Sequence, residues 1–305
     1  MVLQGDTLWI GSLNGLYTYQ LKSRQLNHFD SKQTGLPHNT IYSIIHTKDN
    51  QIYIGTYNGL CRYVQASGKF ENILLPVNRG GSNLFVNSLL EDTTRQCIWI
   101  GMEGYLFQYN PTIGEMKAIE VFHNNSIKSL ALDGDENLLA GTDNGPYVYQ
   151  NDKEPLQHII HDSRNIQSLT NNIIWNIFSD QEHNIWLGTD YGISLSRYNS
   201  ALQFVPISQI TGTGDGNQFY SLFRDSKGFY WFGGTNGVIR FTHPAGNKHD
   251  AIWYRMGDKN HPLSHNRIRH IYEDREQQLW IATDGSINRY DYNTHQFVHY
   301  NIVDS

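Results

Sequence analysis

The segment Trp186-Leu187-Gly188 decides the fold, because versions of it recur along the whole chain. Each copy has an aromatic residue or leucine, then an apolar residue, then glycine or alanine. The spacing is 40 to 49 residues. A period near 45 residues with a tryptophan signature indicates the four-stranded blades of a β-propeller. The seven copies are Trp9-Ile10-Gly11, Tyr53-Ile54-Gly55, Trp99-Ile100-Gly101, Leu139-Ala140-Gly141, Trp186-Leu187-Gly188, Trp231-Phe232-Gly233 and Trp280-Ile281-Ala282.

The second repeat shows how each copy divides into strands. Its strands are expected at 41–46, 52–56, 60–64 and 70–74, with polar turns between them. The turn Asn58-Gly59 has counterparts in three other repeats, and Asn-Gly is typical of a type I′ hairpin turn. No long stretch has a helical period. The sequence therefore predicts an all-β chain, a single seven-bladed β-propeller of four-stranded antiparallel blades.

The 305 residues are expected to form one propeller domain. Residues 1–4 match only the tail of a first strand, so the first blade is expected to lack most of its inner strand. We interpret the chain as a fragment of a longer one. The expected blades are approximately 1–36, 37–82, 83–122, 123–168, 169–214, 215–263 and 264–305.

The first strand of each repeat carries two apolar residues three positions apart, such as Ile174 and Ile177. An odd spacing places side chains on opposite faces of a regular strand. Both faces are therefore expected to be buried between neighbouring blades.

Composition excludes several classes of protein. The chain has 23 Lys and Arg residues against 29 Asp and Glu residues, a formal charge of −6, so no nucleic-acid partner is expected. It has no apolar run of about 18 residues, and its first residues lack the pattern expected of a signal peptide. Its two cysteines, Cys61 and Cys97, are too few for a disulfide scaffold or a four-cysteine zinc site. They are interpreted as buried thiols, although a disulfide between them stays open. No cofactor and no metal are expected.

Residues 172–180 read Asn-Ile-Ile-Trp-Asn-Ile-Phe-Ser-Asp and are followed by Asn-Ile-Trp-Leu-Gly-Thr at 184–189. This pattern resembles the two-component regulator propeller repeat. Pro262-Leu263-Ser264-His265-Asn266 also resembles the lead-in of that family. The resemblance implies the periplasmic sensor region of Bacteroides-type hybrid two-component system regulators. It implies a noncatalytic extracytoplasmic sensor domain that responds to oligosaccharides from glycan breakdown.

The resemblance also implies partners. These are an oligosaccharide ligand, a second propeller and an Ig-like domain of the same full-length protein, and a homodimer. Histidine kinase activity would reside in parts of the full-length protein outside this chain. Two other functions stay open: a propeller enzyme (a polysaccharide or antibiotic lyase, or a glycosidase) and a protein-interaction platform.

The conserved positions of the repeat have structural explanations. The tryptophans of the recurring segment are expected to pack between blades. Trp175 and Trp253 lie outside that register and are better ligand candidates, although packing is expected to explain them too. The aspartate after each first strand, such as Asp180, is expected to accept backbone N–H groups in the next turn.

One position varies while its surroundings follow the repeat: Tyr42, Asn87, Lys128, Trp175, Tyr220 and Arg269. It follows the first apolar residue of the first strand and is expected near the mouth of the central channel, beside the loops between second and third strands. Aromatic and charged residues together suit carbohydrate recognition, although a solvated rim explains them equally well. The candidate ligand-binding residues are Tyr42, Tyr57, Lys128, Asp143, Trp175, Asp190, Tyr191, Tyr220, Arg269 and Asp284.

Overall fold

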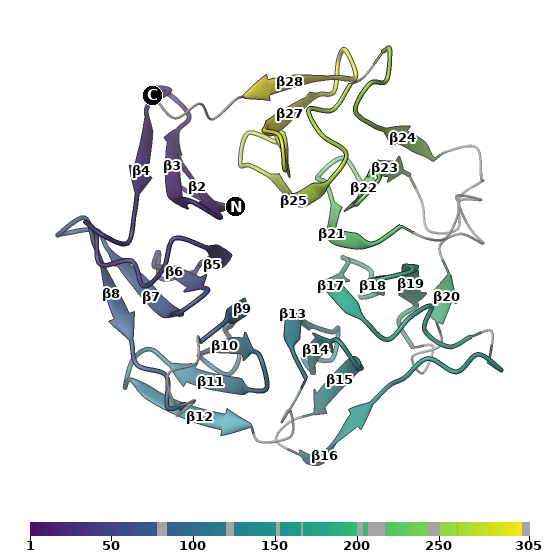
Figure 1. Ribbon diagram of the computed structural model, residues 1–305. Helices are drawn as coiled ribbons and strands as arrows, with labels where there is room; N and C mark the ends of the chain where they lie inside the picture. Colours follow the sequence, from purple (N-terminus) through teal and green to yellow (C-terminus); the bar gives the residue numbers. More distant parts are fainter. Residues whose placement is uncertain are drawn as a thin grey trace. The chain divides into compact units, whose positions relative to one another are not determined.

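A computed structural model describes residues 1–77, 84–119, 125–150, 153–165, 167–199, 204–206, 217–242, 251–260 and 262–300. These residues form 28 strands and no helix. The strands make seven four-stranded antiparallel sheets (Figure 1). The chain forms two compact units, Met1–Leu130 and Ala131–Ser305, which are described separately below. Whether the whole chain is one domain stays a prediction.

Three complete sheets lie in the first unit, and in each of them consecutive strands are neighbours. The first sheet comprises β1 (Val2–Gln4), β2 (Thr7–Ser12), β3 (Gly15–Gln20) and β4 (Leu26–Phe29). The second comprises β5 (Ile41–His46), β6 (Ile52–Thr56), β7 (Gly59–Val64) and β8 (Lys69–Ile73). The third comprises β9 (Val86–Asp92), β10 (Cys97–Met102), β11 (Leu106–Asn110) and β12 (Glu115–Ile119).

The fourth sheet begins at the end of the first unit with β13 (Ile127–Leu132) and continues with β14 (Leu138–Thr142), β15 (Gly145–Gln150) and β16 (Lys153–His158). Three further sheets complete the second unit. The fifth comprises β17 (Ile174–Ser179), β18 (Ile185–Thr189), β19 (Gly192–Ser196) and β20 (Phe204–Pro206). The sixth comprises β21 (Phe219–Arg224), β22 (Tyr230–Gly234), β23 (Gly237–Phe241) and β24 (Ile252–Tyr254). The seventh comprises β25 (Ile268–Glu273), β26 (Leu279–Thr283), β27 (Ile287–Asp291) and β28 (Gln296–Tyr300).

Seven four-stranded meanders of this kind are the blades of a seven-bladed β-propeller fold, so the predicted fold class is confirmed. The short first strand is confirmed as well, because β1 has three residues and its counterpart β5 has six. Each sheet lies inside one of the residue ranges expected for a blade.

The five tryptophans of the repeat are buried as expected, and four of them share a carboxylate with a turn. In the fifth sheet, Asp180 Oδ1 accepts the backbone N–H groups of Glu182 at 3.0 Å and Asn184 at 2.9 Å. Its Oδ2 accepts the indole N–H of Trp186 at 2.8 Å. The same indole bond joins Trp99 to Asp92, Trp231 to Asp225 and Trp280 to Asp274. The turn bonds were predicted; the indole bonds were not.

The glycine of the repeat allows neighbouring sheets to approach closely. A Cβ atom added to Gly233 would lie 2.4 Å from Cγ2 of Ile268, in the first strand of the next sheet. One added to Gly141 would lie 2.7 Å from Cγ2 of Ile174 and 3.1 Å from Cδ1 of Ile177. Such distances are shorter than carbon–carbon contacts permit. The glycine therefore leaves room for the side chains that fill the space between sheets.

Ile174 and Ile177 consequently face the same glycine, and the expectation of opposite faces is wrong. The cause is a β-bulge in the first strand: Ile174 pairs with Thr189, and Asn176 pairs with the next residue, Gly188. The extra residue, Trp175, shifts the alternation of side chains by one position. Bulges at the same place insert Tyr42, Asn87, Tyr220 and Arg269.

The turn between second and third strands also differs from expectation. In Asn58-Gly59 only the glycine has a positive φ, of 119°, whereas type I′ needs positive φ at both central residues. The hydroxyl of Thr56 stabilises the observed turn, since it donates to the carbonyl oxygen of Gly59 at 2.9 Å and accepts the N–H of Asn58 at 3.1 Å. Thr142 and Thr189 hold the corresponding turns of their sheets in the same way.

Candidate functional site

The bulge residues lie at one edge of their sheets. In the five sheets with this bulge, the first strand begins beside the turn between the second and third strands, as the pairing of Ile174 with Thr189 shows. We call this the start edge. A bulge turns a side chain away from the regular pleat. The start edge therefore presents side chains that the packing between sheets does not constrain.

In the second unit, side chains from three sheets meet at the start edge (Figure 1 shows β17, β21 and β25). The Trp175 indole donates to Oδ1 of Asp190 at 3.0 Å, and Nε2 of Gln218 donates to the same oxygen at 2.6 Å. The Tyr220 hydroxyl donates to Oε1 of Gln218. The rings of Trp175 and Tyr220 meet edge to face with centroids 5.2 Å apart. These contacts link the fifth and sixth sheets.

Arginines extend this group to the seventh sheet. Arg267 Nη2 donates to the Tyr220 hydroxyl at 3.3 Å, and its guanidinium lies 5.7 Å from the centre of the Tyr220 ring. The hydrogen bond with Tyr220 raises the pKa of Arg267. Arg269 forms a two-pronged ion pair with Asp284, at 2.5 Å from Nε and 3.2 Å from Nη2. We call these residues the edge cluster: Trp175, Asp190, Gln218, Tyr220, Arg267, Arg269 and Asp284.

The edge cluster contains five of the ten candidate residues and two that the sequence did not single out. Gln218 and Arg267 each lie immediately before the first strand of their sheet, two residues before the bulge residue. Both project hydrogen-bonding groups to a bulge residue, Tyr220. Neither position carries a periodic signal, so the repeat pattern could not single them out.

The first unit holds a separate aromatic group at its start edge. Tyr42 is 45% exposed and lies 6.4 Å from Tyr57 between ring centroids. Tyr57 also meets Phe85 edge to face at 4.4 Å and His38 at 4.9 Å. Burial, and then the neighbouring Tyr57, raises the pKa of Tyr42. This is a hydrophobic platform with a hydroxyl at its exposed rim.

The remaining three candidate residues are Lys128, Asp143 and Tyr191. Lys128 is half-buried in β13. Asp143 is exposed, and its backbone forms an isolated bridge with Gly145. Tyr191 is 53% exposed, and its backbone N–H donates to Oγ1 of Thr189. A role for all ten residues in binding a ligand stays a prediction.

Other predictions concern individual residue types. Cys61 and Cys97 are both buried free thiols, as interpreted from the sequence. Burial raises the pKa of Cys61 far above its usual value. Among the described residues, no three His, Cys, Asp or Glu side chains gather in a way that could hold a metal ion. The described part of the chain contains no helix that is long and apolar enough to cross a membrane.

A family model of the two-component regulator propeller matches the sequence at residues 35–58, 168–191, 213–236 and 262–285. These four segments are two-component regulator propeller repeats. The resemblance seen in the sequence is therefore confirmed. The last three propeller repeats contain every residue of the edge cluster, and the first contains Tyr42 and Tyr57.

The chain is 82% identical to the extracellular domain of BT4673 from B. thetaiotaomicron, a protein described in one structure as a one-component system and in another as a hybrid two-component system. That match covers 99% of this chain and 41% of the solved one, with a TM-score of 0.63. Histidine kinase P4 from Formosa agariphila is 25% identical over 95% of this chain and 22% of its own length. The chain thus spans less than half the length of either relative.

The fold also occurs in an enzyme. Virginiamycin B lyase from Staphylococcus aureus superimposes with a TM-score of 0.65 over 87% of this chain and 85% of the lyase, at 13% sequence identity. At this identity the likeness concerns the fold alone. Propeller folds serve many functions, so the similarity transfers no activity.

Proposed function

We propose that this chain is a noncatalytic ligand-sensing domain of a hybrid two-component regulator and that it senses oligosaccharides. The observation that carries the proposal is the edge cluster, in which aromatic rings and hydrogen-bonding groups from three sheets converge within repeats of the two-component regulator propeller. The similarity to an extracellular domain of that kind of protein supports a sensor role.

The chemistry of the edge cluster suits a sugar. A sugar ring has apolar C–H faces, which can pack on Trp175 and Tyr220, and hydroxyl groups, which need both donors and acceptors. Arg267 and Arg269 supply donors, and the Asp284 carboxylate supplies acceptors. The side chain of Arg269 is 49% exposed and that of Asp284 is 33% exposed. Both can therefore reach a molecule in solution.

The carboxylates of the edge cluster support binding rather than catalysis. Asp190 accepts two N–H donors on one oxygen, and Asp284 is held by both prongs of Arg269. A general acid must carry a proton to the substrate, whereas these carboxylates accept hydrogen bonds from fixed cationic or neutral donors. They position neighbouring side chains.

By the same reasoning from relatives, we propose a periplasmic location. The proposed partners are a second propeller and an Ig-like domain of the same full-length protein, and a second copy of the chain. Kinase activity would belong to the full-length protein.

Isothermal calorimetry with a panel of glycan fragments tests the proposal. Arg269→Ala should weaken binding at least tenfold, because a hydrogen bond to a charged group contributes about 1.5–3 kcal/mol. Trp175→Ala should weaken it by a similar factor through the lost stacking surface. Both variants should retain the circular dichroism spectrum of the parent.

Two variants in the same unit serve as controls. Arg164→Ala removes a more exposed ion pair, with Asp162, and Trp253→Ala removes a tryptophan that stacks under Arg255 outside the edge cluster. Neither should change affinity. Parental affinity in both Arg269→Ala and Trp175→Ala would place the site elsewhere. Absence of binding across the whole panel would refute an oligosaccharide ligand.

A further inference from the structure

Each of two positions in the repeat is aromatic in six of the seven sheets, and the exceptional sheet differs between the two positions. The first is the leading residue of the recurring segment, which is Leu139 in the fourth sheet. The second lies across the hairpin, near the end of the third strand, and is Ser196 in the fifth sheet. Its counterparts are Tyr19, Tyr63, Tyr109, Tyr149, Phe241 and Tyr290.

At other junctions within each unit, these two aromatic positions pack against each other across neighbouring sheets. Trp231 of the sixth sheet meets Tyr290 of the seventh at 4.8 Å between centroids. Trp186 of the fifth sheet lies 5.0 Å from Tyr230 and 6.1 Å from Phe241 of the sixth. Both exceptions fall between the fourth and fifth sheets, where Leu139 and Ser196 replace this pair of rings.

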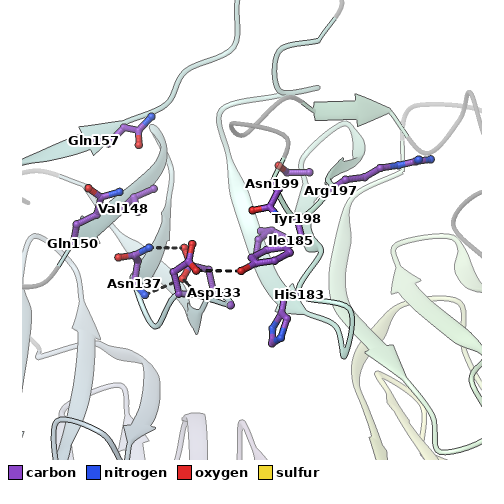
Figure 2. A pocket seen from close by; sticks show the side chains of 13 residues that line it. Asp133, Asn137, Val148, Gln150, Gln157, His183, Ile185, Arg197, Tyr198 and Asn199 are labelled. Atoms are coloured by element: carbon purple, nitrogen blue, oxygen red, sulfur yellow. Dashed lines mark hydrogen bonds between the residues drawn. The ribbon is translucent and has the colours of Figure 1, made fainter.

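A cavity of about 400 Å³ opens at that place (Figure 2). This volume is within the range of small-molecule sites. Ile185 and Ser196, the counterparts of Tyr230 and Phe241, are part of its wall, together with Val148. The cavity therefore lies where the missing rings would pack. Polar side chains complete its lining: Asp133, Asp135, Asn137, Gln150, Gln157, His183, Arg197, Tyr198 and Asn199.

Asp133 is the counterpart of the indole-binding aspartates. Asp180 Oδ2 accepts three donors: Asn184 Nδ2 at 3.0 Å, the Trp186 indole at 2.8 Å and the Tyr230 hydroxyl at 3.0 Å. Asp133 Oδ2 keeps only the bond from Asn137 Nδ2, at 2.9 Å, among the described residues (Figure 2). The Asp133 carboxylate lines the cavity without the indole N–H and the tyrosine O–H that Asp180 accepts.

We propose that this cavity binds an aromatic ring that carries an N–H or O–H donor, such as an indole, from another molecule. The bound ring lies between Val148 and Ile185, where the two aromatic rings of other sheets are absent. Its N–H or O–H group donates a hydrogen bond to Asp133 Oδ2. The remaining volume accommodates the group that bears the ring. The source is either a free aromatic compound or a tryptophan side chain of a protein partner. The site is independent of the edge cluster.

Calorimetry on the whole chain with indole, 1-methylindole and N-acetyltryptophanamide tests this proposal. Indole should bind. 1-Methylindole, which lacks the N–H, should bind at least tenfold more weakly, because it cannot bond to a charged acceptor. Binding of the amide as well as indole would indicate a protein side chain as the source, and binding of indole alone a free compound.

Ser196→Tyr should abolish indole binding, because it restores the ring found in other sheets and fills the cavity. Asp133→Asn should remove the preference for indole over 1-methylindole, which gives a second test should Ser196→Tyr fold poorly. Trp175→Ala should leave indole affinity unchanged. Absence of indole binding at millimolar concentration, indole binding undiminished in folded Ser196→Tyr, or binding of glycans alone in this cavity would overturn the proposal.

Discussion

Trp186→Phe is expected to destabilise the second unit more than Trp9→Phe destabilises the first. Both tryptophans are buried and occupy the same repeat position. They differ in the acceptor of the indole N–H. The acceptor is the buried carboxylate of Asp180, at 2.8 Å, for Trp186 and the neutral amide oxygen of Gln4, at 3.2 Å, for Trp9.

The magnitudes follow from that difference. A hydrogen bond to a charged group contributes about 1.5–3 kcal/mol and one between neutral groups about 0.5–1.5 kcal/mol. Exchange of indole for phenyl removes a similar apolar area at both sites, at a cost of about 1 kcal/mol. We therefore expect a loss in the free energy of unfolding of about 2.5–4 kcal/mol for Trp186→Phe and about 1.5–2.5 kcal/mol for Trp9→Phe.

Urea unfolding followed by circular dichroism measures both losses without using tryptophan fluorescence, which the substitutions change. The double variant Trp186→Phe/Asp180→Asn isolates the coupling between the two side chains. Equal losses in the two tryptophan variants, or no coupling in the double variant, would refute the assignment of stability to the charged indole bond.

Two further predictions concern close packing and pH. Gly233→Ala should destabilise the protein by about 1–3 kcal/mol through overpacking against Ile268; Ile268→Ala should cost less in that background than alone, and strictly additive urea midpoints would contradict this. Burial acts to raise the pKa of Asp92, but bonds from the Arg95 backbone, the Trp99 indole and the Arg95 guanidinium lower it overall. Since its folded pKa lies below its unfolded value of about 4, its stabilisation should be complete above that pH and lost as pH falls through the folded pKa. The urea midpoint of the parent should thus fall more steeply on acidification than that of Asp92→Asn. An equal fall of the midpoint with pH in the two proteins would contradict a lowered pKa of Asp92.

The fold could be predicted from the sequence because the same few residues recur in most blades. Trp186, Gly188 and Asp180 each meet a constraint that most sheets share, so periodicity alone identifies them. The bulge could not be predicted in this way. Ile174 and Ile177 are spaced as if they faced opposite sides, and only the pairing with Thr189 and Gly188 shows the inserted residue.

The candidate site was predictable in part for the same reason. Variation at Trp175, Tyr220 and Arg269 pointed to the start edge, because a bulged position escapes the packing that fixes its neighbours. Gln218 and Arg267 lie before the strand and carry no periodic signal. The cavity beside Ser196 depends on two missing rings from different sheets. Leu139 is visible as an irregular repeat, but its meeting with Ser196 is a property of the folded second unit.

The bulge makes the repeat a natural framework for protein engineering. Each bulged strand contains one residue whose identity the β-ladder does not restrict, flanked by residues that it does. A combinatorial library randomised at Trp175, Tyr220 and Arg269 would vary a continuous surface while every core position stayed constant. Selection from such a library should yield new binding specificities with little loss of folding yield, and substitutions of the buried residue before each bulge, such as Ile174, should be eliminated as insoluble.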